Sequence, residues 1–224
     1  MKRLAVVTGL TVALTAGLAG AARADTTLGS TAIPGGSATN GCEGAVIAQT
    51  ASDPSTPYTV PTPPVGPLSR WQVNVNGANA GEPVTLVVLR STGPTTYTVV
   101  GADTQAIPSS PPPGLVATFT VPSSIAVSGG EILALYSPGP TFVCHFHDGA
   151  TPAADELISL HPGGTPFAGQ GLNLSDSSGP GYTLNLAATL AAPLPATKKK
   201  CKKHKKKRSA DSAKKKKCKK KKKG

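Results

Sequence analysis

Nine short apolar segments, separated by turns rich in glycine and proline, most constrain what this chain can fold into. Each segment has seven to twelve residues, a length that fits a β-strand. None shows the 3.6-residue periodicity of an amphipathic helix. The sequence therefore predicts an all-β fold, an antiparallel β-sandwich or a jelly roll. The segments are 44–50, 70–76, 83–90, 96–107, 114–121, 131–137, 141–147, 155–161 and 181–190, of which 155–161 fits a strand or a helical turn.

The segment RWQVNVN (70–76) indicates which side of its strand is buried. Apolar and polar residues alternate in it, so Trp71 shares a face with two valines and is predicted to lie in the core. Tyr58 lies instead in the proline-rich stretch 52–67. Because proline lacks the N–H that a central strand needs, this stretch predicts an extended surface loop. Its serines and threonines could alternatively carry O-linked sugars.

The N-terminus has the three parts of a secretory signal. Lys2 and Arg3 form a basic start, residues 4–20 are largely apolar, and the sequence ARA ends at Ala24. This pattern predicts a signal peptide at 1–24, with cleavage after Ala24, and an exported mature chain without a transmembrane helix. The alternative is a segment that stays in place as a membrane anchor.

Charge divides the chain into two parts. Residues 25–197 contain ten acids and two arginines, a net charge of −8, whereas residues 198–224 carry seventeen lysines, one arginine and one aspartate, a net charge of +17. Such a division predicts a folded body followed by a separate basic tail. We expect a lead-in segment at 25–43, a β-sandwich domain at 44–192, a linker at 193–197 and a lysine-rich tail at 198–224.

Four cysteines, an even number in a chain predicted to be exported, favour two disulfides. Cys42 and Cys144 lie in the body, and Cys201 and Cys218 lie in the tail, which favours pairing within each part. The other connectivities stay open, as does pairing between molecules through the tail. Closing the long loop from Cys42 to Cys144 would stabilise the fold by about 4–5 kcal/mol in the chain-entropy account.

The succession of segments resembles a group of secreted actinobacterial proteins of uncharacterised function. The resemblance extends loosely over residues 44–224 and rests on RWQVNV, VTLVVLR, TYTVVGADT, VATFTV, GGEILALYS, VCHFHDGA and GYTLNLAATL. In that group a β-sandwich follows a signal peptide and precedes acidic repeats or a cysteine-bearing lysine tail. The resemblance implies a sandwich and export, and it implies no activity.

The densest group of potential metal ligands is CHFHDG (144–149). On a strand, His145 and His147 would share the solvent-facing side, while the cysteine and the neighbouring phenylalanines would face the core. The two histidines, with Asp148 or His161, could hold zinc or copper. Acids in the turns GAD, GGE and HDG could bind calcium. Solvated faces and loops explain the same residues without an ion, so we expect no cofactor.

The sequence gives an enzyme little support, although it leaves the question open. Glycoside hydrolysis needs two carboxylates at one site, but the adjacent Asp155 and Glu156 would point to opposite faces of a strand. The motifs of nucleophile-elbow hydrolases, phosphate-binding loops and zinc proteases are missing from the sequence. A sugar-binding domain would display aromatic platforms, yet Trp71 is predicted to be core and the four tyrosines are scattered. A carbohydrate-binding or glycoside-hydrolase-like domain is kept as the alternative function.

Two cysteines, Cys201 and Cys218, divide the tail. In one straight helix their Cα atoms would be about 25 Å apart, too far for a disulfide. The stretch RSADSA (208–213) interrupts the lysine runs midway between them, and a cap there would allow the tail to fold back. This spacing predicts a disulfide-closed helical hairpin. A disordered tail with two independent thiols is the alternative.

Lysine-rich composition favours diffuse binding to many anionic groups, because an ammonium is a hydrated point charge without the fork of arginine. The predicted partners are anionic cell-wall polymers or lipid headgroups, with nucleic acid as a non-specific ligand because interleaved aromatic residues are missing. We thus expect a secreted, non-enzymatic protein at the cell surface; a tail that folds back onto the acidic body is a further alternative. The polyanion-binding residues would be Lys198, Lys199, Lys200, Lys202, Lys203, Lys205, Lys206, Lys207, Arg208, Lys214, Lys215, Lys216, Lys217, Lys219, Lys220, Lys221, Lys222 and Lys223.

Overall fold

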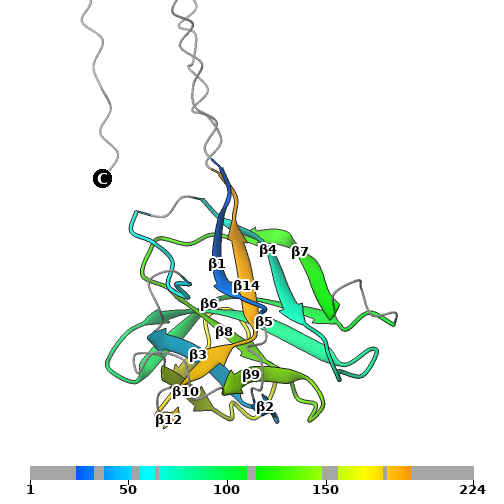
Figure 1. Ribbon diagram of the computed structural model, residues 1–224. Helices are drawn as coiled ribbons and strands as arrows, with labels where there is room; N and C mark the ends of the chain where they lie inside the picture. The colour runs from blue at the N-terminus through cyan, green and yellow to red at the C-terminus, as the bar shows by residue number, and fades with distance from the viewer. Residues whose placement is uncertain are drawn as a thin grey trace, which may run out of the picture. The chain divides into compact units, whose positions relative to one another are not determined.

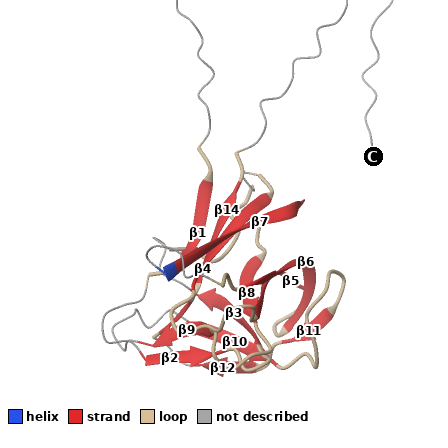
Figure 2. Ribbon diagram, turned by 90° about the vertical axis from the view of Figure 1, so that its right-hand side faces the viewer, coloured by secondary structure: helices blue, strands red, loops and turns tan. Residues whose placement is uncertain are grey.

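The computed structural model describes residues 24–32, 38–51, 56–63, 66–109, 115–147, 156–178 and 181–192. Figure 1 shows the domain that these residues form, and in Figure 2 its elements are strands joined by turns, with one short 3₁₀ segment, in blue, at Leu115. More than half of the described residues lie in strands, and none lies in an α-helix. The prediction of an all-β fold is therefore confirmed.

The described strands are short, and all of their pairings are antiparallel. They are β1 Thr26–Ser30, β2 Ala38–Gly41, β3 Val46–Ala51, β4 Leu68–Asn74, β5 Pro83–Ser91, β6 Thr96–Ala106, β7 Val116–Ile125, β8 Ile132–Tyr136, β9 Val143–His147, β10 Glu156–Leu160, β11 Gly171–Asn173, β12 Asp176–Ser178, β13 Tyr182–Leu184 and β14 Leu186–Leu190.

These strands form three sheets. A four-stranded sheet has the order β1-β14-β4-β7, and a seven-stranded sheet has the order β11-β6-β5-β8-β3-β10-β12. The third sheet, β13-β9-β2, has three strands. Since β13 runs into β14 through the single residue Asn185, one stretch of chain contributes to both the three-stranded and the four-stranded sheets.

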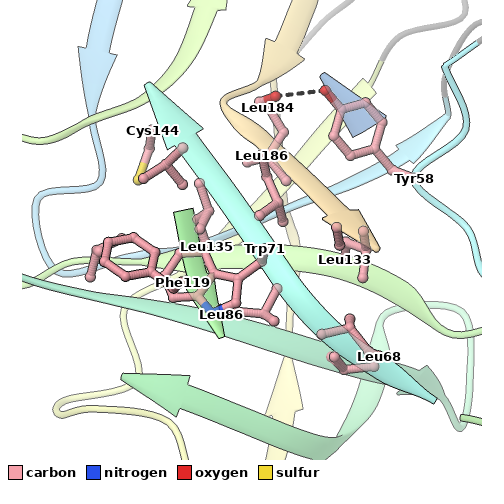
Figure 3. Packing of buried hydrophobic residues seen from close by; sticks show 14 of the residues in the cluster. Tyr58, Leu68, Trp71, Leu86, Phe119, Leu133, Leu135, Cys144, Leu184 and Leu186 are labelled. Atoms are coloured by element: carbon pink, nitrogen blue, oxygen red, sulfur yellow. Dashed lines mark hydrogen bonds between the residues drawn. The ribbon is translucent and has the colours of Figure 1, made fainter. Parts of the chain in front are cut away.

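The larger of two buried clusters draws side chains from both the four-stranded and the seven-stranded sheets. Trp71 of β4 is fully buried, and the centre of its ring lies 4.5 Å from that of Phe119 on β7. Leu86 of β5 and Leu135 of β8 join the same cluster from the seven-stranded sheet (Figure 3). The indole Nε1 of Trp71 donates a 2.7 Å hydrogen bond to Asp103 of β6, so the one polar atom of the ring has a partner. The prediction that Trp71 is a core residue is confirmed.

A second buried cluster lies on the other face of the seven-stranded sheet. On β5, Val87 and Leu89 belong to this cluster, whereas Leu86 and Val88 belong to the larger one. Leu172 and Leu174, from β11 and the residues after it, pack into the second cluster. The middle of β5 is therefore buried on both faces, which is why its sequence is continuously apolar instead of alternating.

Most of the expected segments contain strands, but four short strands were missed: β1 and β2 at the start, and β11 and β12 between the expected segments 155–161 and 181–190. Both β1 and β2 lie within the glycine- and serine-rich residues 25–43, for which the sequence analysis assigned no strand. The segment 155–161, left open between strand and helical turn, contains the strand β10. The single strand expected at 181–190 is two strands, because Asn185 separates β13 from β14.

Tyr58 corrects the prediction that the stretch 52–67 is wholly a surface loop. Its side chain is buried, and its hydroxyl donates a 2.6 Å hydrogen bond to the carbonyl of Leu184 (Figure 3). The hydroxyl also accepts the N–H of Ser30 at 3.1 Å. Gly29 makes room for this ring, since a Cβ at Gly29 would lie 2.6 Å from the Tyr58 ring and φ there is +72°. A locally proline-rich segment is thus drawn against β1 by one aromatic anchor.

Both ends of the folded body leave it side by side. Thr26 at the start of β1 pairs with Leu190 at the end of β14, and the carboxylate of Asp25 accepts the N–H of Ala192 at 2.9 Å. The chain divides into two compact units, residues 1–193 and 194–224, and the boundary between them falls within the predicted linker. No helix among the described residues is long and apolar enough to cross a bilayer. The predicted signal segment lies, but for Ala24, outside the described residues.

Candidate functional site

The three-stranded sheet brings together the histidines that the sequence analysis singled out and an aromatic residue that it did not place with them. β9 lies between β13 and β2, and the register sets Tyr182 directly opposite His147 and Leu184 opposite His145. Opposite residues in an antiparallel pair project to the same side. The ring of Tyr182 consequently meets both imidazoles, with ring centres 5.3 Å from His145 and 4.5 Å from His147.

His145 is buried rather than solvated, which corrects the expected exposed pair. Only 9% of its surface is accessible, and its Nδ1 has no hydrogen-bond partner. Burial, and to a smaller extent the charge interaction with His147, lower the pKa of His145 to about 4. His145 is therefore a neutral imidazole at ordinary pH. The prediction failed here because Tyr182, which covers His145, belongs to a strand far away in sequence.

The unpartnered Nδ1 bears on the predicted metal set. A histidine that binds a metal through one nitrogen ordinarily donates the other N–H to a carbonyl or carboxylate, which fixes the ring. His145 has no such partner among the described residues. His161 is exposed, and Asp148 lies outside the described part. Within that part no group of three potential ligands comes together, and the set His145, His147 and Asp148 stays a prediction.

The other face of β9 carries the disulfide. Cys144 and Phe146 are buried, as is Phe142 just before the strand, which confirms the expected inward face. A disulfide joins Cys42, directly after β2, to Cys144, with the Cα atoms 5.2 Å apart. The predicted pairing in the body is confirmed. Cys201 and Cys218 lie outside the described residues.

Three buried carboxylates stand out as further candidates for chemistry, and Glu131 is the most strongly held of them. It is fully buried, and it forms a 2.5 Å ion pair with Arg90 of β5. The backbone N–H groups of Ser128 and Gly129 donate to the same carboxylate at 3.0 and 2.7 Å. Burial raises the pKa of Glu131, but the bonds from Arg90 and Ser128 outweigh it and hold the pKa at about 2. A carboxylate so stabilised as an anion is poorly suited to general acid–base work near neutral pH.

Glu82 and Asp103 are engaged in a similar, structural way. Glu82 binds the turn before β9, because its carboxylate accepts from the Ser137 hydroxyl and the Phe142 N–H at 3.1 Å each, and from the Thr141 hydroxyl. Asp103 accepts the indole N–H of Trp71, as described above. Each of the three acids thus serves a separate turn or packing contact, and together they form no paired carboxylate site.

Asn185 is a buried polar residue that sequence reasoning missed. It is fully buried between β13 and β14, and its amide nitrogen donates to the carbonyls of Asn74 and Val143 at 2.8 and 2.7 Å. Its amide oxygen accepts the N–H of Asn74 at 2.8 Å. One side chain therefore ties the ends of β4 and β9 to the crossing strand. The single asparagine between two leucines in GYTLNLAATL was the available signal.

A pocket of about 440 Å³ lies between β1 and the segment that follows β3. Its walls are Thr26, Thr27, Leu28, Pro57, Thr59, Val60, Pro61, Thr62 and Gly130. None of these described residues is ionisable, so they provide no acid, base or nucleophile of the carboxylate or thiol kind. The pocket is a candidate for binding.

The predicted polyanion-binding lysines all lie outside the described residues, so the tail is known through its sequence. No protein family, curated protein or solved structure matches this chain.

Proposed function

We propose that this protein is exported and held at an anionic cell-envelope surface by its lysine-rich tail, residues 198–224. The observation that carries the proposal is the segregation of charge. Every lysine after the predicted signal lies in the tail, whereas residues 25–197 carry a net charge of −8. A soluble β-domain gains nothing in folding from a separate block of seventeen lysines, but an anionic surface would bind it.

The body is proposed to be a β-sandwich that supports no catalysis of its own. The shared buried cluster between the four-stranded and seven-stranded sheets supports a sandwich, because two antiparallel sheets bury their inner faces against each other in that architecture. The engagement of Glu82, Asp103 and Glu131 in structural contacts supports a binding or display role over a hydrolase.

The energy of the tether follows from charge alone. Each lysine close to anionic headgroups contributes about 1 kcal/mol, so about eight in contact would give a micromolar surface affinity. Because the attraction is electrostatic, it should weaken steeply as the screening length falls from about 10 Å at 0.1 M salt to about 3 Å at 1 M.

Binding of the full chain to isolated cell walls, anionic vesicles and DNA tests this function. We expect binding at low salt that is lost on deletion of residues 198–224 and on replacement of the tail lysines by glutamine. Replacement by arginine is the matched control, and it should preserve binding because the charge is unchanged. Reduction of the tail cysteines should leave most of the binding for the same reason. Equal low-salt binding by the truncated and full chains would refute the tether and assign recognition to the body.

A further inference from the structure

The pocket beside β1 opens onto the apolar interior of the domain. Leu28 and Val60, two of its wall residues, are each 1% exposed and belong to the larger buried cluster. Towards the outside, the walls are threonine and proline side chains, which present methyl and methylene groups. Gly130 leaves its part of the wall open, since a Cβ built there would meet nothing within 4 Å. The pocket, called the slot below, is thus an open and largely apolar cleft whose lining includes two residues of the core.

The backbone that forms the slot is firmly held. The N–H of Gly29 donates to the carbonyl of Pro57 at 2.9 Å, which joins β1 to the far wall. On that wall, Val60 donates to the carbonyl of Glu131 at 2.7 Å and accepts from the N–H of Gly130 at 2.9 Å. A pocket whose two walls are tied together by hydrogen bonds is preformed, so a ligand would not have to open it.

The contents of the slot are limited by its chemistry. A charged or strongly polar ligand would lose its hydration and find no ionised partner among the nine wall residues. A volume of about 440 Å³ is in the range of small-molecule sites and is far more than a single water needs. An unbranched hydrocarbon chain fits these limits best, because each buried methylene is favourable by about 0.8 kcal/mol.

The position of the slot indicates where such a chain would come from. Thr26 and Thr27 form part of its wall, and Thr26 directly follows Asp25, whose carboxylate binds Ala192. The slot is therefore near the described C-terminal end of the body at Ala192. Under the proposed function, a membrane surface bound by the basic segment would supply hydrocarbon chains.

We propose that this slot takes one acyl chain of a membrane lipid at the anionic surface to which the tail binds. The choice of a lipid as the source rests on the proposed function, whereas alkyl binding by the slot stands on its walls alone. The tail would supply long-range, salt-sensitive attraction, and the slot would add a short-range apolar contact that salt does not weaken.

Calorimetric titration of the full chain with alkylphosphocholines below their critical micelle concentrations tests the slot. These probes are zwitterionic, so neither the basic tail nor the acidic body attracts them by net charge. Wild-type protein should bind decylphosphocholine about 14-fold more tightly than octylphosphocholine, at about fourfold per methylene, with a negative heat-capacity change. An affinity that does not change with chain length would overturn the proposal.

Two substitutions locate the binding. Thr59→Phe places a ring at the mouth of the slot, and Thr120→Phe places the same ring on an exposed residue of β7 outside it. Decylphosphocholine affinity should fall at least tenfold in Thr59→Phe and stay within twofold of wild type in Thr120→Phe. Thr27→Phe, on the opposite wall, repeats the test should the first variant fail to fold, as judged by urea unfolding. Equal loss in all three variants would indicate general adsorption and refute the slot.

Vesicles of phosphatidylglycerol and phosphatidylcholine then test the source of the chain. At 1 M salt, where tail attraction is screened, wild type should retain binding that Thr59→Phe lacks. If the probe binds the slot but this difference is missing, the membrane-lipid assignment is wrong. A failed tether gives a separate result, since low-salt binding would then be insensitive to tail charge while the probe titration is unaffected.

Discussion

Acid should destabilise this domain through one buried imidazole, that of His145. Its pKa is about 4 in the folded chain against 6.5 for an unperturbed histidine, because burial and the nearby His147 disfavour the charged ring. The unfolded chain therefore takes up the proton first as the pH falls. The contribution of neutral His145 to the free energy of unfolding is fully present above pH 6.5. It declines as the pH drops toward 4, by about 3 kcal/mol in total.

Urea unfolding of the oxidised full chain between pH 7.5 and pH 4 measures this loss. The variant His145→Phe keeps an aromatic ring but cannot take up a proton, and it removes the unpartnered Nδ1. The difference in unfolding free energy between the two proteins should shift in favour of the variant by about 3 kcal/mol across this range. His161→Phe, at an exposed histidine, is the matched control and should follow the wild-type curve.

Two features make this test specific to His145: the groups that face it are unchanged in the variant, and Glu131 titrates in a lower pH range. Among the described residues these groups are His147 and Tyr182, which are unchanged in the variant, so the difference isolates His145. Glu131 titrates lower, with a pKa of about 2 against 4.5, so its contribution is lost chiefly below pH 4.5. Parallel curves for wild type and His145→Phe between pH 6.5 and 4.5 would refute the account of a buried, neutral histidine.

Two further predictions concern the contacts that hold the sheets together. Asn185→Leu should destabilise the domain by at least about 3 kcal/mol in urea unfolding, because three backbone groups of Asn74 and Val143 lose their partner inside the fold; a loss below 1 kcal/mol would show that water replaces the amide. Replacing Cys42 and Cys144 by serine should cost about 4.7 kcal/mol, as expected for a disulfide that closes a loop of 102 residues. Equal midpoints of thermal unfolding for the serine variant and the oxidised wild type would contradict that assignment.

The strands that could be predicted are those whose own sequence carries the signal. Alternation in 70–76 and continuous apolar runs such as 83–90 depend on nearby residues alone, and β4 and β5 lie there. β1 and β2 contain glycine, serine and asparagine, which have little intrinsic preference for strands. They are strands because β14 and β9, more than 100 residues later, pair with them. Such pairing leaves no local pattern to detect.

The same limit explains what was missed at the candidate site. The order CHFH fixes which residues of β9 share a face, so the buried cysteine and phenylalanine could be predicted. The burial of His145 depends on Tyr182, which the register of β13 sets against β9. Asn74 was likewise expected on the polar face of its strand, yet it is 9% exposed where Asn185 binds its backbone. Long-range register, which periodicity does not encode, decided each of these outcomes.

Charge counting separates the proposed tether from a tail that folds back onto its own body. Of the ten acids in residues 25–197, Glu82, Asp103 and Glu131 are buried and engaged, which leaves seven. The tail has a net charge of +17, so even complete pairing with those seven acids would leave ten positive charges unmatched. Concentrated within 27 residues, these charges would repel one another. Internal contacts would therefore leave most of the tail's charge unpaired, which favours the proposed tether over a tail that folds back onto the body.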